Sequence, residues 1–292
     1  MTAQMQRGER LRELHKGPKT FLMPNAWDPG SACILGAAGF QCLATTSAGI
    51  AYSLGQPDIE GCVSRSQMME RIHLIASAVD LPVSADLEAG FGAAPHEVAE
   101  TIRLAIQAGV VGGNIEDLSG DPQMPLLDIG LSGERIRAAR EAADSSGIAF
   151  TLTARTDCYL AGVTNPFAEA VRRANFFREM GADCLFVPGI KDAETIAALV
   201  REINGPLNVV MGLTGNAFTV SQLGALGVKR ISIGGSLARS ALGLVRCAAQ
   251  EMMNQGSFRF AEQQIPDAEL CSFFGTINKA PLTHELEPDL ER

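Results

Sequence analysis

The sequence is poor in aromatic and basic residues, and both shortages limit what the protein can be. Phe, Trp and Tyr supply only 5% of the 292 residues, with a single Trp, so the hydrophobic core must be built from aliphatic side chains. Lys and Arg number 24 against 33 Asp and Glu, which gives a net charge of −9. This charge argues against nucleic acid or an anionic membrane as the main partner, although a local cation can still attract an anionic substrate.

Long apolar runs and paired cysteines are also missing. No run of about 18 uncharged apolar residues is present, and residues 1–17 lack the apolar centre of a secretion signal. The seven cysteines form no CxxC pair, which favours free thiols in a reducing compartment over disulfides. We therefore expect a cytoplasmic protein that does not span a membrane.

Short apolar segments alternate with helical ones along most of the chain, and this alternation predicts the fold. The predicted strands are residues 21–26, 42–47, 81–88, 110–117, 149–156, 182–189, 207–212 and 228–235. Amphipathic helices are expected between them, among others over 64–79, 95–108, 132–146, 166–180 and 193–203. Alternating strands and helices make a parallel sheet, and eight units favour a closed (β/α)8 TIM barrel over an open doubly wound sheet.

The C-terminal segment differs from the rest in composition. We expect the barrel to occupy residues 1–255 and residues 256–292 to form a helical tail. This tail contains Phe258, Phe260, Phe273 and Phe274, a large share of the protein's Phe. Packing on the barrel or on a neighbouring subunit would remove these rings from water.

Acidic residues follow neighbouring predicted strands. Asp86 and Glu88 end the third strand, and Glu116 lies near the end of the fourth. The carboxyl ends of barrel strands carry the active site, and residues two apart on an ideal strand point the same way. Carboxylates sharing one site need a cation, and oxygen ligands without a histidine at a strand end favour Mg²⁺ or Mn²⁺ over Zn²⁺. We therefore predict a divalent cation at Asp86, Glu88 and Glu116.

Plainer interpretations exist for several of these positions. An acidic residue after a strand can simply cap the next helix, which we expect of Asp28 and which Asp58 could also do. Three caps rarely converge on neighbouring loops, so capping is the weaker explanation for the carboxylate cluster. Arg155, at the end of the fifth strand, can pair with Glu116 or Asp157 or bind a substrate carboxylate. The residues alone leave both options open.

The order of these motifs resembles the isocitrate lyase/phosphoenolpyruvate mutase superfamily. The matching segments are PNAWDPGSA, GFQCLATTSAGIA with LGQPD, LPVSADLEAGFG, GGNIEDLSGD, TARTD and GADCLFVPG. Together they cover almost the whole predicted barrel. The run from Asp86 to Gly92 is specific because Ile-Glu-Asp and Ala-Arg-Thr-Asp follow it on the next two strands.

The resemblance implies a Mg²⁺-dependent enzyme, with Mn²⁺ as the alternative ion. Its substrate would be a small 2-oxo or 2-hydroxy acid that reacts through an enolate. Asp86 would bind the metal directly, while Asp58, Glu88 and Glu116 would bind it directly or through water. Asp58 and Glu116 are also expected to take part in catalysis.

The same resemblance implies a substrate-binding group. The Ser47 side chain and the backbone amides of Ala48 and Gly49 would hold the substrate oxygens. Arg155 would bind the substrate carboxylate and take part in catalysis.

The loop after the fourth strand departs from the superfamily pattern. Isocitrate and methylisocitrate lyases place a K-(K/R)-C-G-H motif there, whereas residues 118–130 read LSGDPQMPLLDIG, with no Cys, Lys or His. Carbon–carbon cleavage or decarboxylation of a small (di)carboxylate is the leading hypothesis. A phosphonopyruvate-type P–C hydrolase or mutase and a non-catalytic oxo-acid-binding barrel are the alternatives. We expect this loop to act as a lid.

Oligomeric state is a further implication of the resemblance. Superfamily members commonly exchange their last barrel helix between subunits. We therefore expect a homodimer or homotetramer in which residues 237–254 and the tail take part.

Overall fold

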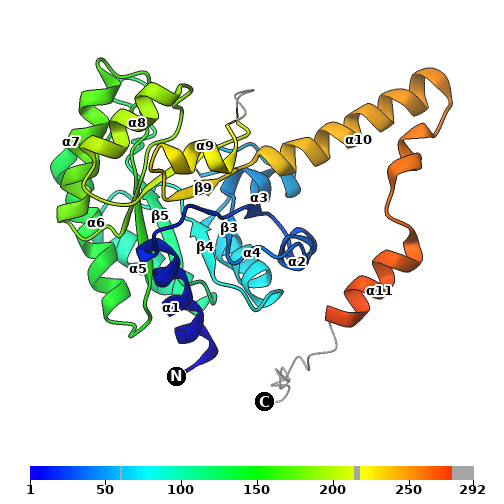
Figure 1. Ribbon diagram of the computed structural model, residues 1–292, viewed down its shortest axis with the longest axis horizontal. Coiled ribbons are helices and arrows are strands. Elements are labelled where there is room, and N and C mark those ends of the chain that lie inside the picture. The colour runs from blue at the N-terminus through cyan, green and yellow to red at the C-terminus, as the bar shows by residue number, and fades with distance from the viewer. Residues whose placement is uncertain (60, 214–217, 278–292) are drawn as a thin grey trace, which may run out of the picture. The chain divides into compact units, whose positions relative to one another are not determined.

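The computed structural model describes residues 1–59, 61–213 and 218–277 (Figure 1). Within these ranges nine parallel strands form one sheet in the order β1-β9-β8-β7-β6-β5-β4-β3-β2. The strands are β1 Phe21–Leu22, β2 Asn25–Ala26, β3 Leu43–Thr45, β4 Val83–Asp86, β5 Gly112–Glu116, β6 Thr151–Arg155, β7 Cys184–Phe186, β8 Leu207–Val210 and β9 Arg230–Ser232. The helices are α1 Ala3–Lys16, α2 Pro29–Ala37, α3 Ser47–Ser53, α4 Arg65–Ser77, α5 Pro95–Gln107, α6 Ile129–Asp144, α7 Pro166–Glu179, α8 Ala193–Glu202, α9 Val220–Ala225, α10 Ser236–Gln255, η1 Arg259–Gln263 and α11 Asp267–Ile277.

One short segment of chain closes the sheet into a barrel. β1 pairs with β9, where Phe21 lies opposite Arg230, and β2 pairs with β3, where Asn25 lies opposite Ala44. Between them the Met23 amide donates a 2.8 Å hydrogen bond to β9. Residues 21–26 are therefore the single first strand that the sequence predicts, and its two halves join both edges of the sheet. The predicted (β/α)8 fold class is confirmed.

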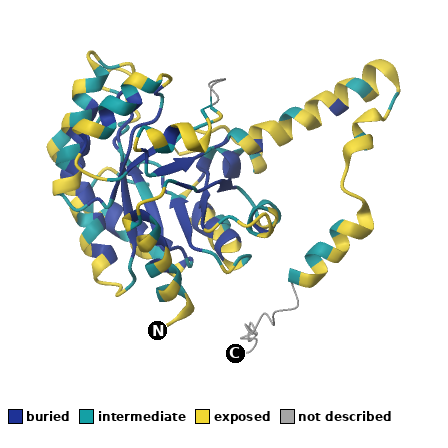
Figure 2. Ribbon diagram, viewed as in Figure 1, coloured by how far each residue is buried: buried dark blue, intermediate teal, exposed yellow. Residues whose placement is uncertain are grey.

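Two hydrophobic cores hold the barrel together. The larger lies between the strands and the surrounding helices, and its members are mostly Ala, Val, Ile and Leu, as the shortage of aromatic residues requires. In Figure 2 the strands are accordingly buried, while the outer faces of the helices are exposed. The smaller core comprises Leu11, Phe21, Met23, Cys42, Ala44 and Val111. It links α1, a helix that the sequence analysis did not predict, to the amino-terminal part of the barrel.

Capping residues and glycines mark the ends of the helices. Asp28 caps α2, because its carboxylate accepts from the Ser31 amide at 2.7 Å, so the capping interpretation is confirmed. The predicted helix over 132–146 begins earlier, at Ile129, because Asp128 accepts from the Leu131 amide. Glycines with positive φ follow several helices, a conformation that commonly ends a helix: Gly39, Gly109, Gly147, Gly181 and Gly227.

Contacts divide the chain into two compact units, Met1–Ser240 and Ala241–Arg292. The first unit contains the barrel. The second contains most of α10, then η1 and α11; within it the rings of Phe273 and Phe274 meet edge to face at 5.0 Å. The expected boundary at residue 255, where α10 ends, differs from this division, and both the boundary and the separate role of the tail stay predictions. Residues 278–292 of that tail lie outside the described part of the chain.

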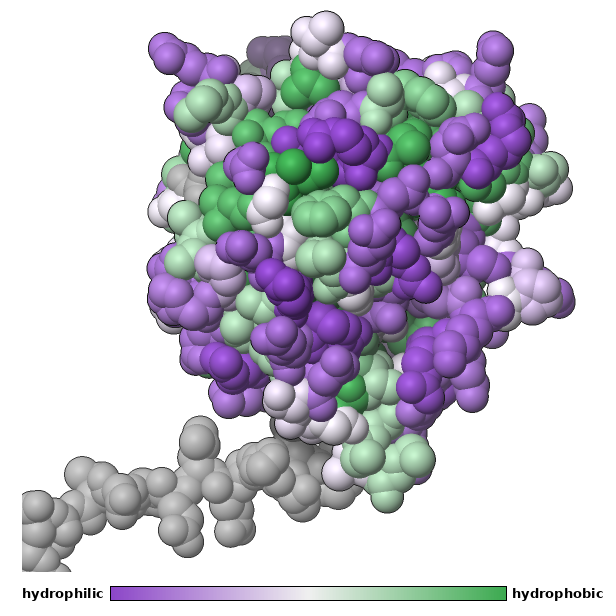
Figure 3. Space-filling model, turned by 90° about the vertical axis from the view of Figure 1, so that its left-hand side faces the viewer, coloured by the Kyte–Doolittle hydropathy of each residue, from purple (hydrophilic) through white to green (hydrophobic). Residues whose placement is uncertain are grey.

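The surface and the cysteines agree with the composition. No described helix is both long and apolar enough to cross a lipid bilayer. Figure 3 shows hydrophilic side chains interspersed with small apolar areas on the side of the molecule that carries α7. All seven cysteines are free thiols, and four of them are buried.

Candidate active site

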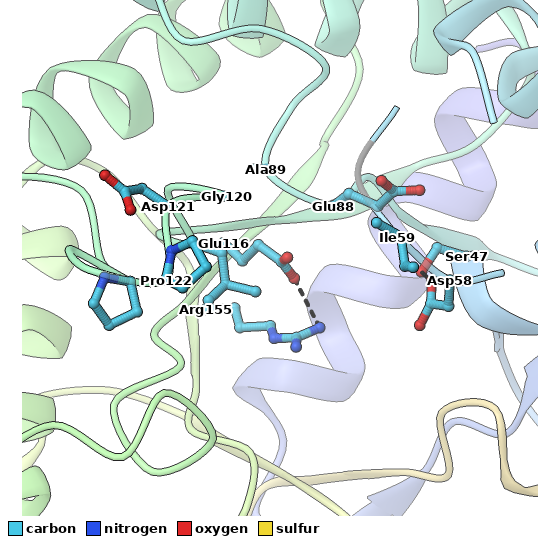
Figure 4. A pocket seen from close by; sticks show the side chains of 12 residues that line it. Ser47, Asp58, Ile59, Glu88, Ala89, Glu116, Gly120, Asp121, Pro122 and Arg155 are labelled. Atoms are coloured by element: carbon cyan, nitrogen blue, oxygen red, sulfur yellow. Dashed lines mark hydrogen bonds and ion pairs between the residues drawn. The ribbon is translucent and has the colours of Figure 1, made fainter. Parts of the chain in front are cut away.

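Most of the predicted site residues surround one cavity in the first unit. It has a volume of about 580 Å³ and is lined by Ser47, Asp58, Glu88, Glu116 and Arg155 (Figure 4). These residues follow the carboxyl ends of β3 to β6, the end of the barrel where the site was expected. A second cavity of about 220 Å³ shares three of these residues and is also lined by Asp86 and Ala48.

Asp86, the last residue of β4, has a carboxylate fixed by neighbouring strands. Ser47 donates to its Oδ2 from both the backbone amide and the hydroxyl, each at 3.0 Å. Asn114 on β5 donates to Oδ1 at 3.0 Å. The Asp86 amide donates to the Thr45 hydroxyl at 2.9 Å. Because both oxygens are held, the carboxylate has one orientation before any ligand binds.

Asp58 reaches the same serine from the loop after α3. The distance from the Ser47 hydroxyl to Asp58 Oδ1 is 3.4 Å. Burial raises the pKa of Asp58, and the negative charge of Asp86 raises it further. The two carboxylates therefore act on each other across Ser47, and a cation between or beside them would relieve this repulsion.

Arg155 lies between two carboxylates. Its Nη1 contacts Glu116 Oε2 at 2.8 Å, the pair marked in Figure 4, and its Nη2 contacts Asp157 Oδ1 at 2.9 Å. Burial raises the pKa of Glu116 well above its usual value, although Arg155 opposes the shift. The Arg155 guanidinium also stacks over the Phe186 ring, 5.4 Å from its centre. Arg155 therefore forms ion pairs with both expected partners, Glu116 and Asp157. Its binding to a substrate stays a prediction.

Glu88 is placed differently from Asp86. β4 ends at Asp86, and Glu88 has a φ of 50°, so it lies beyond the strand. The alternation argument that put both side chains on one face therefore does not apply to Glu88. Its carboxylate points away from that of Glu116 (Figure 4), while its backbone carbonyl accepts from the Glu116 amide at 3.0 Å.

The carboxylates do not form a ready metal cage. Among the described residues, no group of three or more His, Cys, Asp and Glu side chains is arranged to hold an ion. Mg²⁺ does not require such a cage, because it commonly uses one or two carboxylates and keeps several waters. The oxygen donors of Asp86, Asp58 and Ser47 fit this hard cation. Glu88 and Glu116 line the larger cavity together with Asp58 and Ser47, and contact with an ion there through water is feasible.

The predicted substrate-binding residues Ser47, Ala48 and Gly49 form the first turn of α3. The Ser47 amide is bonded to Asp86, and the Gly49 amide donates to the capping hydroxyl of Thr46 at 3.3 Å. A side chain at position 49 would meet Thr46 at 2.7 Å, so packing alone requires glycine there. The proposed contact with substrate therefore rests mainly on the Ala48 amide and the Ser47 hydroxyl.

The loop after β5 is anchored at both ends. Asp117 is buried and accepts from the Thr156 hydroxyl at 2.7 Å, from the Asp157 amide at 3.0 Å and from Arg173 at 3.1 Å. Arg173 also donates to the Leu127 carbonyl at 2.9 Å. Between these anchors, residues 118–125 contribute to the lining of the larger cavity. The arrangement suits a lid, which stays a prediction.

The sequence analysis missed two groups that shape the site. Asn114 orients Asp86, and Asp117 anchors the loop. Strand periodicity could have revealed Asn114, because it lies two residues before Glu116 on β5 and so faces the same way. No sequence signal separates Asp117 from Glu116, its neighbour.

Comparisons with known proteins agree with this geometry. The family model described as phosphoenolpyruvate phosphomutase matches residues 11–253. A solved protein of Burkholderia cenocepacia J2315, provisionally named a lyase/mutase, is 48% identical, with a TM-score of 0.90, over 93% of this chain and 96% of its own. The 2,3-dimethylmalate lyase of Eubacterium barkeri is 31% identical over 69% of this chain and 70% of its own.

A third relative has a ligand in its solved structure. Oxaloacetate acetylhydrolase, solved with its product oxalate, is 26% identical, with a TM-score of 0.82, over 94% of each chain. A family model that spans most of the barrel, together with relatives aligned along it, is decisive. The chain belongs to the phosphoenolpyruvate phosphomutase family, within the phosphoenolpyruvate mutase/isocitrate lyase superfamily.

Proposed function

We propose that this protein is a Mg²⁺-dependent carbon–carbon lyase that acts on a small 2-oxo or 2-hydroxy dicarboxylate. The observation that carries the proposal is the fixed Asp86 carboxylate, held by Ser47 in the cavity pair that also contains Arg155. A carboxylate for a metal and an arginine for a substrate carboxylate are the two elements needed to bind a metal-chelating oxo acid.

The relatives support this substrate class. Dimethylmalate is a 2-hydroxy dicarboxylate and oxaloacetate a 2-oxo dicarboxylate, and these are the compounds named in the two relatives' activities. Both compounds can present adjacent oxygens to a metal and a second carboxylate to a cation.

In the proposed site Asp86 would bind Mg²⁺ directly, with Asp58, Glu88 and Glu116 binding through water. Bound there, Mg²⁺ would supply Lewis-acid stabilisation of an enolate. Ser47 and the Ala48 amide would orient the substrate oxygens. Arg155 would hold a carboxylate and keep its charge, because Glu116 and Asp157 raise its pKa against the effect of burial.

Two ionisable side chains that line the larger cavity, Asp121 and Glu116, are considered for the general acid or base. The loop after β5 contributes five residues to the lining of the larger cavity: Leu118, Gly120, Asp121, Pro122 and Pro125. Of these five, Asp121 has an ionisable side chain. We assign this loop the role of excluding water. Among buried groups, Glu116 has a strongly raised pKa and contacts Arg155, which suits a group that exchanges a proton with substrate.

The test is a substrate panel. Release of pyruvate, glyoxylate or oxalate should be measured from C4 to C6 2-oxo and 2-hydroxy dicarboxylates, with Mg²⁺, with Mn²⁺ and with a chelator. Metal-dependent turnover of at least one compound is expected. Absence of turnover together with absence of metal-dependent oxalate binding would overturn the proposal.

Two alternatives have observations in their favour. The family model is named for a phosphomutase, and phosphate release from phosphonopyruvate would support P–C chemistry. Residues 118–130 contain no Cys, Lys or His, which suits a non-catalytic binding barrel that would bind oxalate with metal but turn nothing over. The expected homodimer or homotetramer is tested separately by light scattering, and a monomer would contradict it.

A further inference from the structure

The interior of the barrel below the candidate site is hollow and partly polar. The smaller cavity, which we call the chamber, extends from Asp86 and Arg155 to Ser84, Asn208 and Arg230. TIM-barrel interiors are normally filled by bulky branched side chains. Here small and amide side chains leave a space of about 220 Å³ with hydrogen-bonding walls.

Arg230 lines this chamber from β9 and is only 3% exposed. Its Nε donates to Asn208 Oδ1 at 2.9 Å and its Nη1 to the Thr153 hydroxyl at 3.0 Å. Nη1 also lies 3.3 Å from His15 Nε2. Every one of these partners is an uncharged acceptor. Within the described ranges, no carboxylate forms an ion pair with Arg230, and no residue accepts from its Nη2.

The titratable side chains beside Arg230 are two thiols and an imidazole, and none of them supplies a negative charge. The carboxylates of Asp58 and Asp86 also line the chamber, but in the described part of the chain neither forms an ion pair with Arg230. Burial raises the pKa of the Cys42 thiol to about 12 and also raises that of Cys184, although Arg230 opposes both shifts. Both thiols are therefore protonated at neutral pH. Burial lowers the pKa of His15 to about 3, and Arg230 lowers it further. His15 is thus a neutral acceptor, with its Nδ1 2.8 Å from the Leu11 carbonyl.

Arg155 offers a useful contrast within the same chamber. It already contacts the carboxylates of Glu116 and Asp157, whereas Arg230 contacts no carboxylate among the residues that the structure describes. An isolated buried cation is costly unless an anion accompanies it. The guanidinium fork is also well suited to a carboxylate, because it donates two parallel hydrogen bonds.

We propose that the chamber is an anion-binding site in which Arg230 holds a carboxylate or another small anion that enters from the candidate active site. The anion has two sources: a free ion, or the second carboxylate of the dicarboxylate proposed above as substrate. Only the second source rests on the proposed function.

The first experiment tests the free ion and needs neither metal nor turnover. Thermal unfolding is followed while sodium formate replaces an equal ionic strength of a bulky sulfonate salt. For the free ion we expect a saturable rise of the midpoint in the wild type and in Arg140→Met, and no rise in Arg230→Met. Arg140 is the matched control, because it is partly buried but paired with Asp144 and Asp183 outside the chamber.

The second experiment tests the substrate carboxylate with a matched ligand pair. Malate and 2-hydroxybutyrate have the same carbon chain and differ in the distal group. With Mg²⁺ present, calorimetry should show at least tenfold tighter binding of malate to the wild type, and Arg230→Met should lose about 10- to 100-fold of that preference, as for a lost charge-assisted hydrogen bond.

Each outcome decides the proposal. A formate response or a malate preference that depends on Arg230 supports it and identifies the source. If the wild type shows neither, the proposal is overturned even when the enzyme turns over its substrate. If Arg230→Met does not fold, crystals grown in bromide replace it: an anomalous peak beside the Arg230 guanidinium supports an anion site, and water alone there overturns it.

Discussion

Both donors of Ser47, its backbone amide and its hydroxyl, bind the same oxygen of Asp86 at 3.0 Å. The serine begins a helix and the aspartate ends a strand, so two rigid elements determine the contact. A carboxylate oriented in this way suits a metal or substrate site, because its side chain loses little conformational entropy when the ligand binds.

Asp86→Asn tests this group with almost no change of volume. The amide can still accept from Ser47 but loses the negative charge, so we expect metal-dependent turnover to fall at least about 100-fold, as when one electrostatic contact to a transition state is lost. The measurement is kcat and oxalate affinity as a function of Mg²⁺. Asp192→Asn is the control, because Asp192 caps α8 away from both cavities. Equal effects of the two substitutions would contradict the assignment.

Asp117→Asn tests the anchor of the loop. Asp117 is 2% exposed and binds Arg173 at 3.1 Å, so removal of its charge leaves Arg173 with less compensation. We expect a loss of about 3 kcal/mol in the free energy of unfolding, measured by denaturant titration. Glu100→Gln breaks an exposed ion pair with Arg103, and its effect should stay below about 0.5 kcal/mol.

Gly133→Ala tests the contact between α6 and α7. A Cβ at position 133 would overlap the Phe176 ring, so either the ring or one of the two helices must move. We expect a loss of about 1–3 kcal/mol of stability, although alanine favours helix formation. Gly243→Ala in α10 is the matched case, since nothing lies within 4 Å of its Cβ position. A neutral result for Gly133→Ala would show that the ring moves without cost.

His15 predicts a specific dependence of stability on pH. Its pKa is about 3 in the folded protein, mainly because of burial and then the charge of Arg230, against 6.5 unfolded. As pH falls below about 6.5, the unfolded chain binds the proton first, so stability present above this value is lost progressively toward pH 3.

The expected loss from this residue is about 3 kcal/mol between pH 7 and pH 4. The measurement is unfolding free energy against pH for the wild type and for His15→Gln. The buried acids with raised pKa values, such as Asp117, act in the opposite direction, but they are common to both proteins. The difference between the two curves should therefore shrink as pH falls, and parallel curves would contradict the prediction.

Much of the fold follows from the sequence because strands and helices alternate with clear periodicity and with glycine at the helix ends. Two helices, α1 and α3, were not predicted from the sequence. α1 is polar, with few apolar positions such as Leu11, and its burial depends on the barrel it packs against. α3 has only seven residues, too few to show a helical period.

The site was predictable in position but not in pairing. The rule that barrel strands carry functional groups at their carboxyl ends placed Asp86, Glu116 and Arg155 together. It could not show that Arg155 contacts both Glu116 and Asp157, because contact depends on side-chain conformation. The role of Arg230 was not predicted for a different reason. Arg230 lies at the beginning of β9, where a basic residue is usually on the surface.

The divided first strand also determines when the sheet can close during synthesis. Residues 21–26 are made before the other strands, yet β1 has no partner until β9 is synthesised near the end of the barrel. A nascent or truncated chain that stops before residue 230 therefore has two free sheet edges, at β1 and at β8. Free edges pair readily with other chains, so such fragments should aggregate, while a few residues more of synthesis remove both edges at once.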